Sequence, residues 1–318
     1  MFSRKYNYSK VLIGYESNLH PDYEKINEEV YQWFIKYKLP LHSEDEEKHA
    51  REDVAKFVCM CYPETANKRA VLICKFMIHI LIVDDLIERN VPSIFFDSLV
   101  NHGNENHDVI ATLDKCYTAT QTPLVASFAD IWSQMKSLTN TAWQKRFAEG
   151  YIWWLKANGW ERKNHKVNRV PSLMEFIEYR QFTGVVISLI QLSRDIFLPE
   201  SVMTNFTLQK IFSVTGSIVC LVNDIYSFEK EEAEGDMGNL VAVMKHEYSI
   251  SEQEAIKKAT VFINNEIEKF KLLESILPTF EGETNENVKK IVHGCKHWIT
   301  GNHDWGFESG RYTMSSLK

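Results

Sequence analysis

Three oxygen-bearing side chains, Asn223, Ser227 and Glu231, are the first candidates for chemistry in this sequence. They occur in the stretch LVNDIYSFEKEEAEG (221–235), which begins as an apolar helix and becomes strongly acidic. Because they recur at intervals of four residues, all three project from one face of a helix. An amide, a hydroxyl and a carboxylate in one row suit a metal ion, but an apolar helix that emerges into water would also become acidic. The stretch alone leaves both interpretations open.

A second acidic motif, IVDDLIERN, ends another apolar stretch of the chain. Asp84 and Glu88 are four residues apart and share a helix face, whereas Asp85 is turned about 100° away. Asp224 and Lys230 stand beside members of the first row. The candidate ligands are all oxygen donors, which favours a hard cation such as Mg²⁺ or Mn²⁺ over zinc. Carboxylates at a helix C-terminus oppose the helix dipole, so they require solvation or a neutralising metal. Two such motifs in one helical chain predict a metal site.

The elements that must position these motifs are predicted to be helices. Strand signals are scarce, whereas helical periodicity is frequent. Residues 21–39 carry one apolar stripe, and residues 65–88 become apolar nearly all round, as in a helix inside a bundle. Further helices are predicted over residues 124–157, 172–196, 208–232, 251–276 and 285–300. We expect a single all-α domain over residues 1–318, a bundle of about ten helices, with residues 1–20 as a flexible N-terminal segment.

Composition and charge exclude several classes of protein. The chain has 318 residues, of which 44% are hydrophobic and 25% charged, as in ordinary soluble globular proteins. Its formal net charge of −7 argues against a nucleic-acid binder, which needs basic patches. The acidic run SEDEEKHARED (43–53) also contains Lys and Arg, so we expect it to form a solvated helix face.

The cysteines and histidines predict no further metal site. The six cysteines form no CxxC pair, which argues against a zinc site and a disulfide framework. HGCKH (293–297) places two histidines four residues apart, but the sequence shows no acidic or thiolate partner for them. The N-terminus lacks the apolar core of a signal peptide, and residues 70–83 are too short an apolar stretch to cross a bilayer. We therefore expect a cytoplasmic protein with no membrane span.

Over nearly its whole length the chain resembles the class I terpene synthases (terpene cyclases) of microbial type. DDLIE matches their aspartate-rich motif, and NDIYSFEKE matches their NSE metal-binding motif, including the Lys before the final Glu. HPDYEKINEEVYQWFIKYKL is similar to their N-terminal Pro-to-Trp helix, GDMGNLV to the segment after the NSE motif, and NHDWGFESGRY to their C-terminal ending. The first motif and the Lys/Asn/Ile usage are most similar to the terpene synthases of social amoebae. The resemblance implies the class I terpenoid synthase fold.

The resemblance also implies a set of metal ligands. Asp84 would bridge two Mg²⁺ ions, and the NSE residues would hold a third, with Mn²⁺ able to substitute. Asp85 and Asp224 would support the ligands without touching the metal. The full set of implied ligands is Asp84, Glu88, Asn223, Ser227 and Glu231.

The resemblance further implies four side chains that would bind the diphosphate of a prenyl diphosphate substrate, a group that charge-assisted hydrogen bonds suit. These are Arg180, Lys230, Arg311 and Tyr312. YRQFTGVV (179–186) is similar to the family's effector segment, with Arg180 as sensor, Thr183 as linker and Gly184 as effector. A glycine inside a helix costs about 0.5–1 kcal/mol relative to Ala, and we favour a helix break facing the substrate over close packing. Two positions depart from the family pattern: Thr183 stands where Asp is frequent, and the first motif ends in Glu88.

An apolar pocket would fold the isoprenoid chain and lend π density to a carbocation. The C-terminal match assigns Trp305 to this pocket, and helix position adds Phe57, Phe76 and Ile80, for which core packing is the alternative. We expect a Mg-dependent enzyme that ionises a prenyl diphosphate, by default farnesyl diphosphate, and cyclises it to a sesquiterpene.

Two alternatives to a cyclase stay open. A prenyl diphosphate synthase would carry a second aspartate-rich motif where this chain has NDIYSFEKE. A catalytically inactive helical interaction protein would tolerate loss of the motif residues. The substrate chain length (C10, C15 or C20) and the product are not fixed by the sequence, and the protein is expected to be a monomer or a homodimer.

Overall fold

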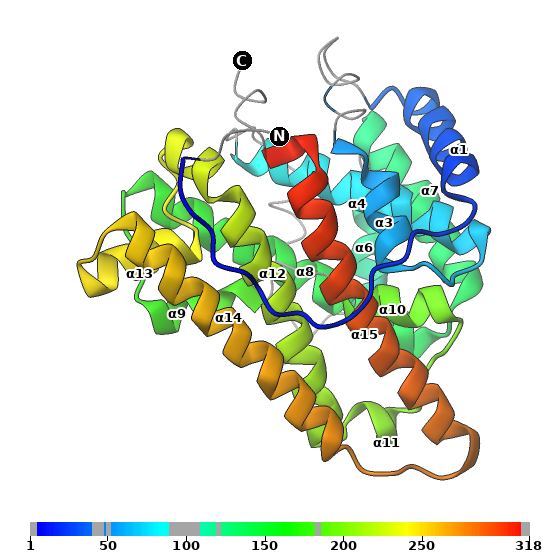
Figure 1. The fold of residues 1–318 in the computed structure, drawn as a ribbon. Helices are drawn as coiled ribbons and strands as arrows, with labels where there is room; N and C mark the ends of the chain where they lie inside the picture. Colours follow the sequence, from blue (N-terminus) through cyan, green and yellow to red (C-terminus); the bar gives the residue numbers. More distant parts are fainter. Residues whose placement is uncertain are drawn as a thin grey trace.

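The structure is a computed structural model that describes residues 5–39, 48, 52–88, 109–118, 122–181 and 186–312. Within these residues it contains thirteen α-helices, one 3₁₀ helix and no strand, so the expected all-α fold is confirmed (Figure 1). In chain order the helices are α1 (Tyr23–Lys36), α3 (Val54–Cys61), α4 (Asn67–Glu88), α6 (Val109–Thr118), α7 (Pro123–Leu138), α8 (Thr141–Lys166), α9 (Leu173–Arg180), α10 (Ile187–Arg194), α11 (Glu200–Met203), α12 (Phe206–Glu234), α13 (Leu240–Tyr248), α14 (Glu252–Ser275), α15 (Gly282–Glu308) and the 3₁₀ helix η2 (Gly310–Tyr312).

The predicted helical segments correspond to these helices, with differences at their boundaries. Residues 124–157 and 172–196 each contribute to two helices. The first of them is divided at Asn140, whose side chain caps α8 by accepting a hydrogen bond from the backbone N–H of Trp143 (2.9 Å). Helices α3, α6, α11 and α13 fall outside the predicted ranges because each has ten residues or fewer, too few turns for a clear apolar periodicity.

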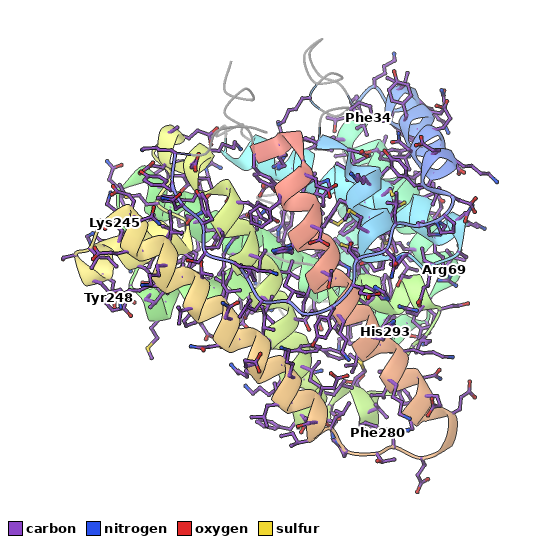
Figure 2. All side chains as sticks on the ribbon, in the orientation of Figure 1. Phe34, Arg69, Lys245, Tyr248, Phe280 and His293 are labelled. Carbon is purple, nitrogen blue, oxygen red and sulfur yellow. The ribbon has the colours of Figure 1, made fainter. Side chains whose placement is uncertain are left out.

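Helix α12 lies at the centre of the bundle and packs against α14 and α15 (Figure 1). The side chain of Asn205 caps its start by accepting from Leu208 N, and Gly235, with a φ of 75°, ends it in the left-handed conformation. Among the described helices, α12 alone is long and apolar enough to cross a membrane, but 83% of its most apolar window is buried in the bundle. Side chains fill the spaces between the helices (Figure 2). We interpret α12 as a core helix that places its acidic C-terminal half at one end of the core.

The N-terminal segment was predicted to be flexible over residues 1–20, and the structure describes residues 5–20 of it. Residues 5–20 run in extended form across α12 and α14 (Figure 1). The backbone N–H of Lys5 donates to Glu229 of α12 (3.1 Å), and that of Leu12 donates to Asn264 of α14 (2.8 Å). Two apolar side chains of the segment are buried in the core. Hydrogen bonds along its length and buried side chains fix the path of this segment on the bundle.

A buried aromatic cluster joins α4, α7 and α8. Phe76 and His79 of α4 pack against Phe128 of α7 and Tyr151 of α8, with ring centroids 4.6 to 6.5 Å apart. The ring of His79 is fully buried, and its Nε2 lies 2.9 Å from the hydroxyl of Tyr151. Burial lowers the pKa of His79 to about 3, so the ring is neutral in the folded protein.

We predict that this histidine makes the protein less stable in mild acid. In the unfolded chain a histidine titrates near pH 6.5, so below that pH only the unfolded state gains the proton. The contribution of neutral His79 to the free energy of unfolding is complete above pH 6.5. It is lost as the pH falls, by about 1.4 kcal/mol per pH unit, or about 2 kcal/mol by pH 5. Urea unfolding at several pH values measures this slope. His79→Gln, which keeps a donor for Tyr151, should show a shallower slope than the wild type, and equal slopes would contradict the assignment.

Candidate active site

One cavity, lined by residues of α3, α4, α8, α9, α12, α15 and η2, contains most of the predicted site residues. Its volume is about 180 Å³, far above the ~10–15 Å³ that one water needs. The charged and hydrogen-bonding residues of its wall include Asp84, Glu161, Arg180, Asn223, Lys230, Glu231, Asp236, Arg311 and Tyr312. The apolar and aromatic residues include Phe57, Met77, Ile80, Leu81, Trp154, Val219, Cys220, Trp298 and Trp305.

The aspartate-rich motif ends α4 at the wall of this cavity. Asp84 lines the cavity with its side chain 31% exposed, whereas Asp85 forms an ion pair with Lys48. Arg311 Nη2 lies 3.8 Å from Asp84 Oδ2 and 3.5 Å from Asp85 Oδ1. Enclosure by the protein raises the pKa of Asp84 despite Arg311. At Asp85 the effect of burial is outweighed by Arg311 and Lys48, so its pKa is lowered. Asp84 is therefore the carboxyl group that is less fully neutralised by the protein.

Two members of the NSE row line the cavity, as their spacing predicts. Asn223 Nδ2 donates to the hydroxyl of Tyr312 (2.9 Å), and Glu231 Oε2 accepts from Asn239 (2.8 Å). Burial raises the pKa of Glu231 to about 7. Ser227 lies between them on α12 but is 1% exposed, and its hydroxyl donates to the backbone oxygen of Asn223 (2.8 Å). The row therefore shares a helix, but the hydroxyl of its middle residue is directed at that helix's own backbone.

The last described residues of the chain join the two motifs. Arg311 contacts Asp84 of α4, and Tyr312 contacts Asn223 of α12. Oxygen donors from both helices thus face the same part of the cavity. Burial raises the pKa values of Asp84 and Glu231 by more than the nearby cations lower them. Such a donor set fits a hard divalent cation.

A buried ion pair holds Arg311 in place. Glu52 Oε1 accepts from Arg311 Nη1 (2.7 Å), and the two side chains are 7% and 6% exposed. The backbone oxygen of Glu52 also accepts from the indole N–H of Trp305 (3.0 Å). Glu52 belongs to the acidic run 43–53, for which we predicted a solvated helix face, and for this residue the prediction is wrong. Its partner lies 259 residues away in the sequence, and no local pattern indicates that pairing.

Arg180 lies between two carboxyl groups, of which Asp224 is buried and Glu161 is 22% exposed. Its Nε and Nη2 donate to Asp224 Oδ1 (3.1 and 2.6 Å), and Asp224 Oδ2 accepts from the backbone N–H of Leu240 (3.1 Å). Arg180 Nη1 also lies 3.6 Å from Glu161 Oε1, which accepts no hydrogen bond from any described residue. Burial raises the pKa of Glu161 to about 8. The sequence predicted Asp224 as a supporting residue but missed Glu161, which no motif contains.

The structure describes only some of the other predicted site residues. Lys230 lines the cavity and lies 3.8 Å from Glu234 on its own helix. Glu88 ends α4, but its side chain lies outside the described part of the chain, as do Thr183 and Gly184 entirely.

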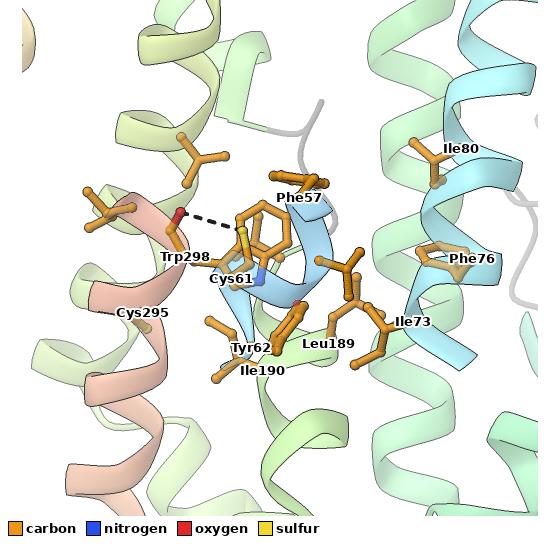
Figure 3. Packing of buried hydrophobic residues seen from close by; sticks show 14 of the residues in the cluster. Phe57, Cys61, Tyr62, Ile73, Phe76, Ile80, Leu189, Ile190, Cys295 and Trp298 are labelled. Carbon is orange, nitrogen blue, oxygen red and sulfur yellow. Dashed lines mark hydrogen bonds between the residues drawn. The ribbon is translucent and has the colours of Figure 1, made fainter. Parts of the chain in front are cut away.

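The apolar wall of the cavity includes three of the four residues predicted to line a pocket. Phe57, Ile80 and Trp305 line the cavity. The ring centroid of Phe57 lies 4.7 Å from that of Trp305. It lies 5.5 Å from the ring centroid of Trp298 (Figure 3). The prediction for Phe76 is wrong, because its ring is fully buried in the aromatic cluster with His79 and does not reach the cavity. On a helix that is apolar nearly all round, the sequence does not distinguish the face toward a cavity from the face toward the core.

Several solved structures with a similar fold are terpene synthases. The structure is similar to that of α-eudesmol synthase, with a TM-score of 0.81 and 20% identity over 93% of this chain and 98% of that one. It is similar to linalool/nerolidol synthase from Streptomyces clavuligerus in complex with 2-fluorogeranyl diphosphate, with a TM-score of 0.78 and 20% identity over 96% of this chain and 100% of that one. The architecture is therefore the class I terpenoid synthase fold.

Sequence comparison identifies the family. Residues 75–269 match the model described as terpene synthase family 2, C-terminal metal binding. The 10-epi-cubebol synthase of Sorangium cellulosum is 27% identical over 307 residues, which cover 92% of this chain and 94% of that protein. The pristinol synthase of Streptomyces pristinaespiralis is 25% identical over 96% of this chain and 85% of that protein. The chain belongs to the terpene synthase family, and is thus a metal-dependent enzyme that acts on a prenyl diphosphate. The predicted special likeness to social amoebae is not confirmed, since these relatives are bacterial.

Proposed function

We propose that the protein is a Mg²⁺-dependent sesquiterpene synthase that ionises farnesyl diphosphate, cyclises the carbocation and releases diphosphate. The observation that carries this proposal is a single cavity in which two oxygen-donor motifs and three basic side chains meet an aromatic wall. The name of one relative, a (+)-T-muurolol synthase of Roseiflexus castenholzii that is 30% identical over 59% of this chain, includes (2E,6E)-farnesyl diphosphate cyclizing. That name supports a C15 substrate.

The metal ions would be held by α4 and α12. Asp84 and Asn223 both contact η2, and Glu231 lines the same cavity. Ser227 would join them by turning its hydroxyl from its own helix toward the cavity. We propose three Mg²⁺ ions, with Glu88 as an additional ligand and Mn²⁺ able to substitute. When bound, Mg²⁺ acts as a Lewis acid, and its positive charge stabilises the leaving diphosphate. Binding also requires ionised carboxylates, which the positive charge of the metal favours.

The chain's own cations would bind the diphosphate. Arg180, Lys230 and Arg311 line the same cavity, and the hydroxyl of Tyr312 adds a further donor. Arginine donates several charge-assisted hydrogen bonds in a fixed plane, which suits diphosphate oxygens. Because the net charge of the protein is −7, these local cations are needed to attract an anionic substrate. Thr183 and Gly184 would follow Arg180 as linker and effector, as the family pattern implies.

The apolar part of the cavity would protect and guide the carbocation. Phe57, Trp298 and Trp305 form contiguous aromatic surface on its wall. Ring faces stabilise a nearby cation by its attraction to their quadrupoles, and an enclosed cavity keeps out water that would quench it. The released diphosphate can take the final proton, so no dedicated base is required.

No comparable observation supports a prenyl diphosphate synthase or an inactive interaction protein. A prenyl diphosphate synthase would need a second aspartate-rich motif, where this chain has the NSE row on α12. An inactive interaction protein has no need for Asp224 and Glu52 to hold two buried guanidinium groups beside a cavity. We also propose a cytoplasmic location and a monomeric or homodimeric state, which cell fractionation and light scattering would test.

We predict that Asn223→Ala abolishes turnover without unfolding the protein. Loss of the amide oxygen removes one ligand of the proposed third metal, and loss of one such electrostatic contact typically lowers kcat by about 10²–10³-fold. Diphosphate release from farnesyl diphosphate measures turnover, and circular dichroism measures helicity, which should be unchanged. Asn265→Ala on the exposed face of α14 is the matched control and should keep full activity. If Asn223→Ala remains active, the assignment of this metal is wrong.

A further inference from the structure

A second cluster of potential metal ligands lies beside the middle of α15, where Figure 2 labels His293. His293 and His297 are one helical turn apart, and Glu64 in the connection between α3 and α4 faces both of them. No acidic partner for this histidine pair is evident from the sequence. In the structure Glu64, more than two hundred residues away in the sequence, is that partner. The prediction that HGCKH has no acidic partner is therefore wrong.

The distances among the three donors are those of a metal site. The two Nε2 atoms are 2.9 Å apart, and Glu64 Oε1 lies 3.8 Å from each of them. Ligands of a tetrahedral zinc ion with bonds of about 2.0–2.1 Å lie about 3.3 Å from one another. Small side-chain rotations would therefore place all three donors at bonding distance from one ion. Two imidazoles and a carboxylate favour zinc over Mg²⁺, which separates this cluster chemically from the all-oxygen motifs.

Close helix packing brings the ligands together. A Cβ on Gly294 would lie 2.6 Å from Ile190 of α10, and one on Gly301 would lie 2.6 Å from the backbone of Met60 on α3. Because these two positions are glycine, α10 approaches the backbone of α15 closely before His297, and α3 approaches it closely after His297. The α3–α4 connection and the end of α10 are thereby held beside the two rings.

The carboxylate is oriented by its own neighbours. Arg194 at the end of α10 forms an ion pair with Glu64 Oε2 and leaves Oε1 directed at the histidines. The next residue, Thr65, donates its hydroxyl to the backbone oxygen of Ser193 (2.7 Å), which anchors the connection on α10. Outer contacts of this kind orient ligands in metal sites. Glu64 and His293 are half exposed while His297 is buried, so an ion can enter from solvent.

We infer that Glu64, His293 and His297 form a binding site for one zinc ion or a similar divalent transition metal, with water in the fourth position. The ion would connect α15 to the α3–α4 connection and, through Arg194, to α10. The site lies apart from the proposed catalytic motifs: His297 precedes Trp298 of the cavity wall but is turned about 100° from it around the helix. It would act as a clamp on the fold. The alternative is a hydrogen bond between two neutral histidines with no metal.

Measured zinc binding distinguishes a metal site from a hydrogen-bonded pair of neutral histidines. Full-length protein without an affinity tag is stripped with chelator and titrated with Zn²⁺ in excess Mg²⁺, and bound zinc is counted by mass spectrometry. We expect one zinc per chain. His293→Gln should weaken binding by at least about 10–100-fold, whereas His246→Gln on the exposed surface of α13 and Asp84→Asn should bind like the wild type. Bound Co²⁺ should show the visible absorption of a tetrahedral nitrogen and oxygen site.

Thermal unfolding gives an independent measure. At a zinc concentration about 100 times the Kd, the Tm of the wild type should rise by about 5 °C, because the ligand binds only the folded state. The Tm of His293→Gln should not respond, while its circular dichroism without metal should match the wild type. Absence of zinc binding to the wild type, or equal binding by His293→Gln, would overturn the inference.

Discussion

Asp84→Asn is expected to lower kcat/KM for farnesyl diphosphate by at least about 10²–10³-fold, equivalent to about 3–4 kcal/mol of transition-state stabilisation. Asp84 lines the cavity, and its carboxyl group is less fully neutralised than that of Asp85. Asparagine keeps the shape of the side chain but removes the charge that a bridging metal ligand needs. The measurement is steady-state kinetics at several Mg²⁺ concentrations, in which the variant should also require more Mg²⁺.

A matched control and a second readout make this prediction specific. Asp85→Asn makes the same chemical change one residue away, at a side chain paired with Lys48, and should have a clearly smaller effect on kcat/KM. The stability of Asp84→Asn should equal or exceed that of the wild type, because the raised pKa of Asp84 shows that the fold disfavours its charge. Equal kinetic losses in the two variants would contradict the distinction between ligand and support.

The second large effect concerns stability as well as activity. Asp224→Ala is expected to lower the free energy of unfolding by about 3–5 kcal/mol, because it leaves the buried guanidinium of Arg180 without its principal counter-ion. Asp224 is fully buried and also accepts from Leu240 N, so its loss leaves a second polar group unpaired. Diphosphate release should be lost in parallel, since Arg180 would no longer be held at the cavity wall. Urea unfolding at pH 7 measures the change in stability.

Glu161→Gln is the matched control, because Glu161 is the other carboxyl group beside Arg180. Its pKa of about 8 means that it is mostly neutral at pH 7, so glutamine resembles the group already present. The free energy of unfolding should change by less than about 1 kcal/mol at pH 7. A loss as large as that of Asp224→Ala would show that Arg180 depends on Glu161 for its charge balance instead.

The parts of the site that were predicted are those encoded by spacing within one helix. The four-residue interval places Asn223 and Glu231 on one face of α12, and both line the cavity. The same rule groups Ser227 with them but says nothing about its χ1 angle, and its hydroxyl contacts the helix backbone. Helix geometry fixes the direction of the Cα–Cβ bond, whereas the position of the terminal atoms of the side chain depends on partners from other elements.

The parts that were missed depend on contacts between distant segments. Glu52 and Glu64 have the local sequence of surface carboxylates, yet one is buried against Arg311 and the other faces two histidines of α15. Phe76 was assigned to the pocket because its helix is apolar nearly all round and gives no sign of which face meets the core. Glu161 lies on α8, at a position that no motif includes. Each of these outcomes follows from how the helices pack, which periodicity does not encode.

The measurement that tests the central claim most directly is incubation of the purified protein with Mg²⁺ and geranyl, farnesyl or geranylgeranyl diphosphate, followed by mass spectrometry of the organic extract. The account predicts a sesquiterpene from farnesyl diphosphate, formed only when Mg²⁺ is present and absent with Asp84→Asn. No terpene from any of the three substrates, or a longer prenyl diphosphate formed only when isopentenyl diphosphate is added, would contradict it.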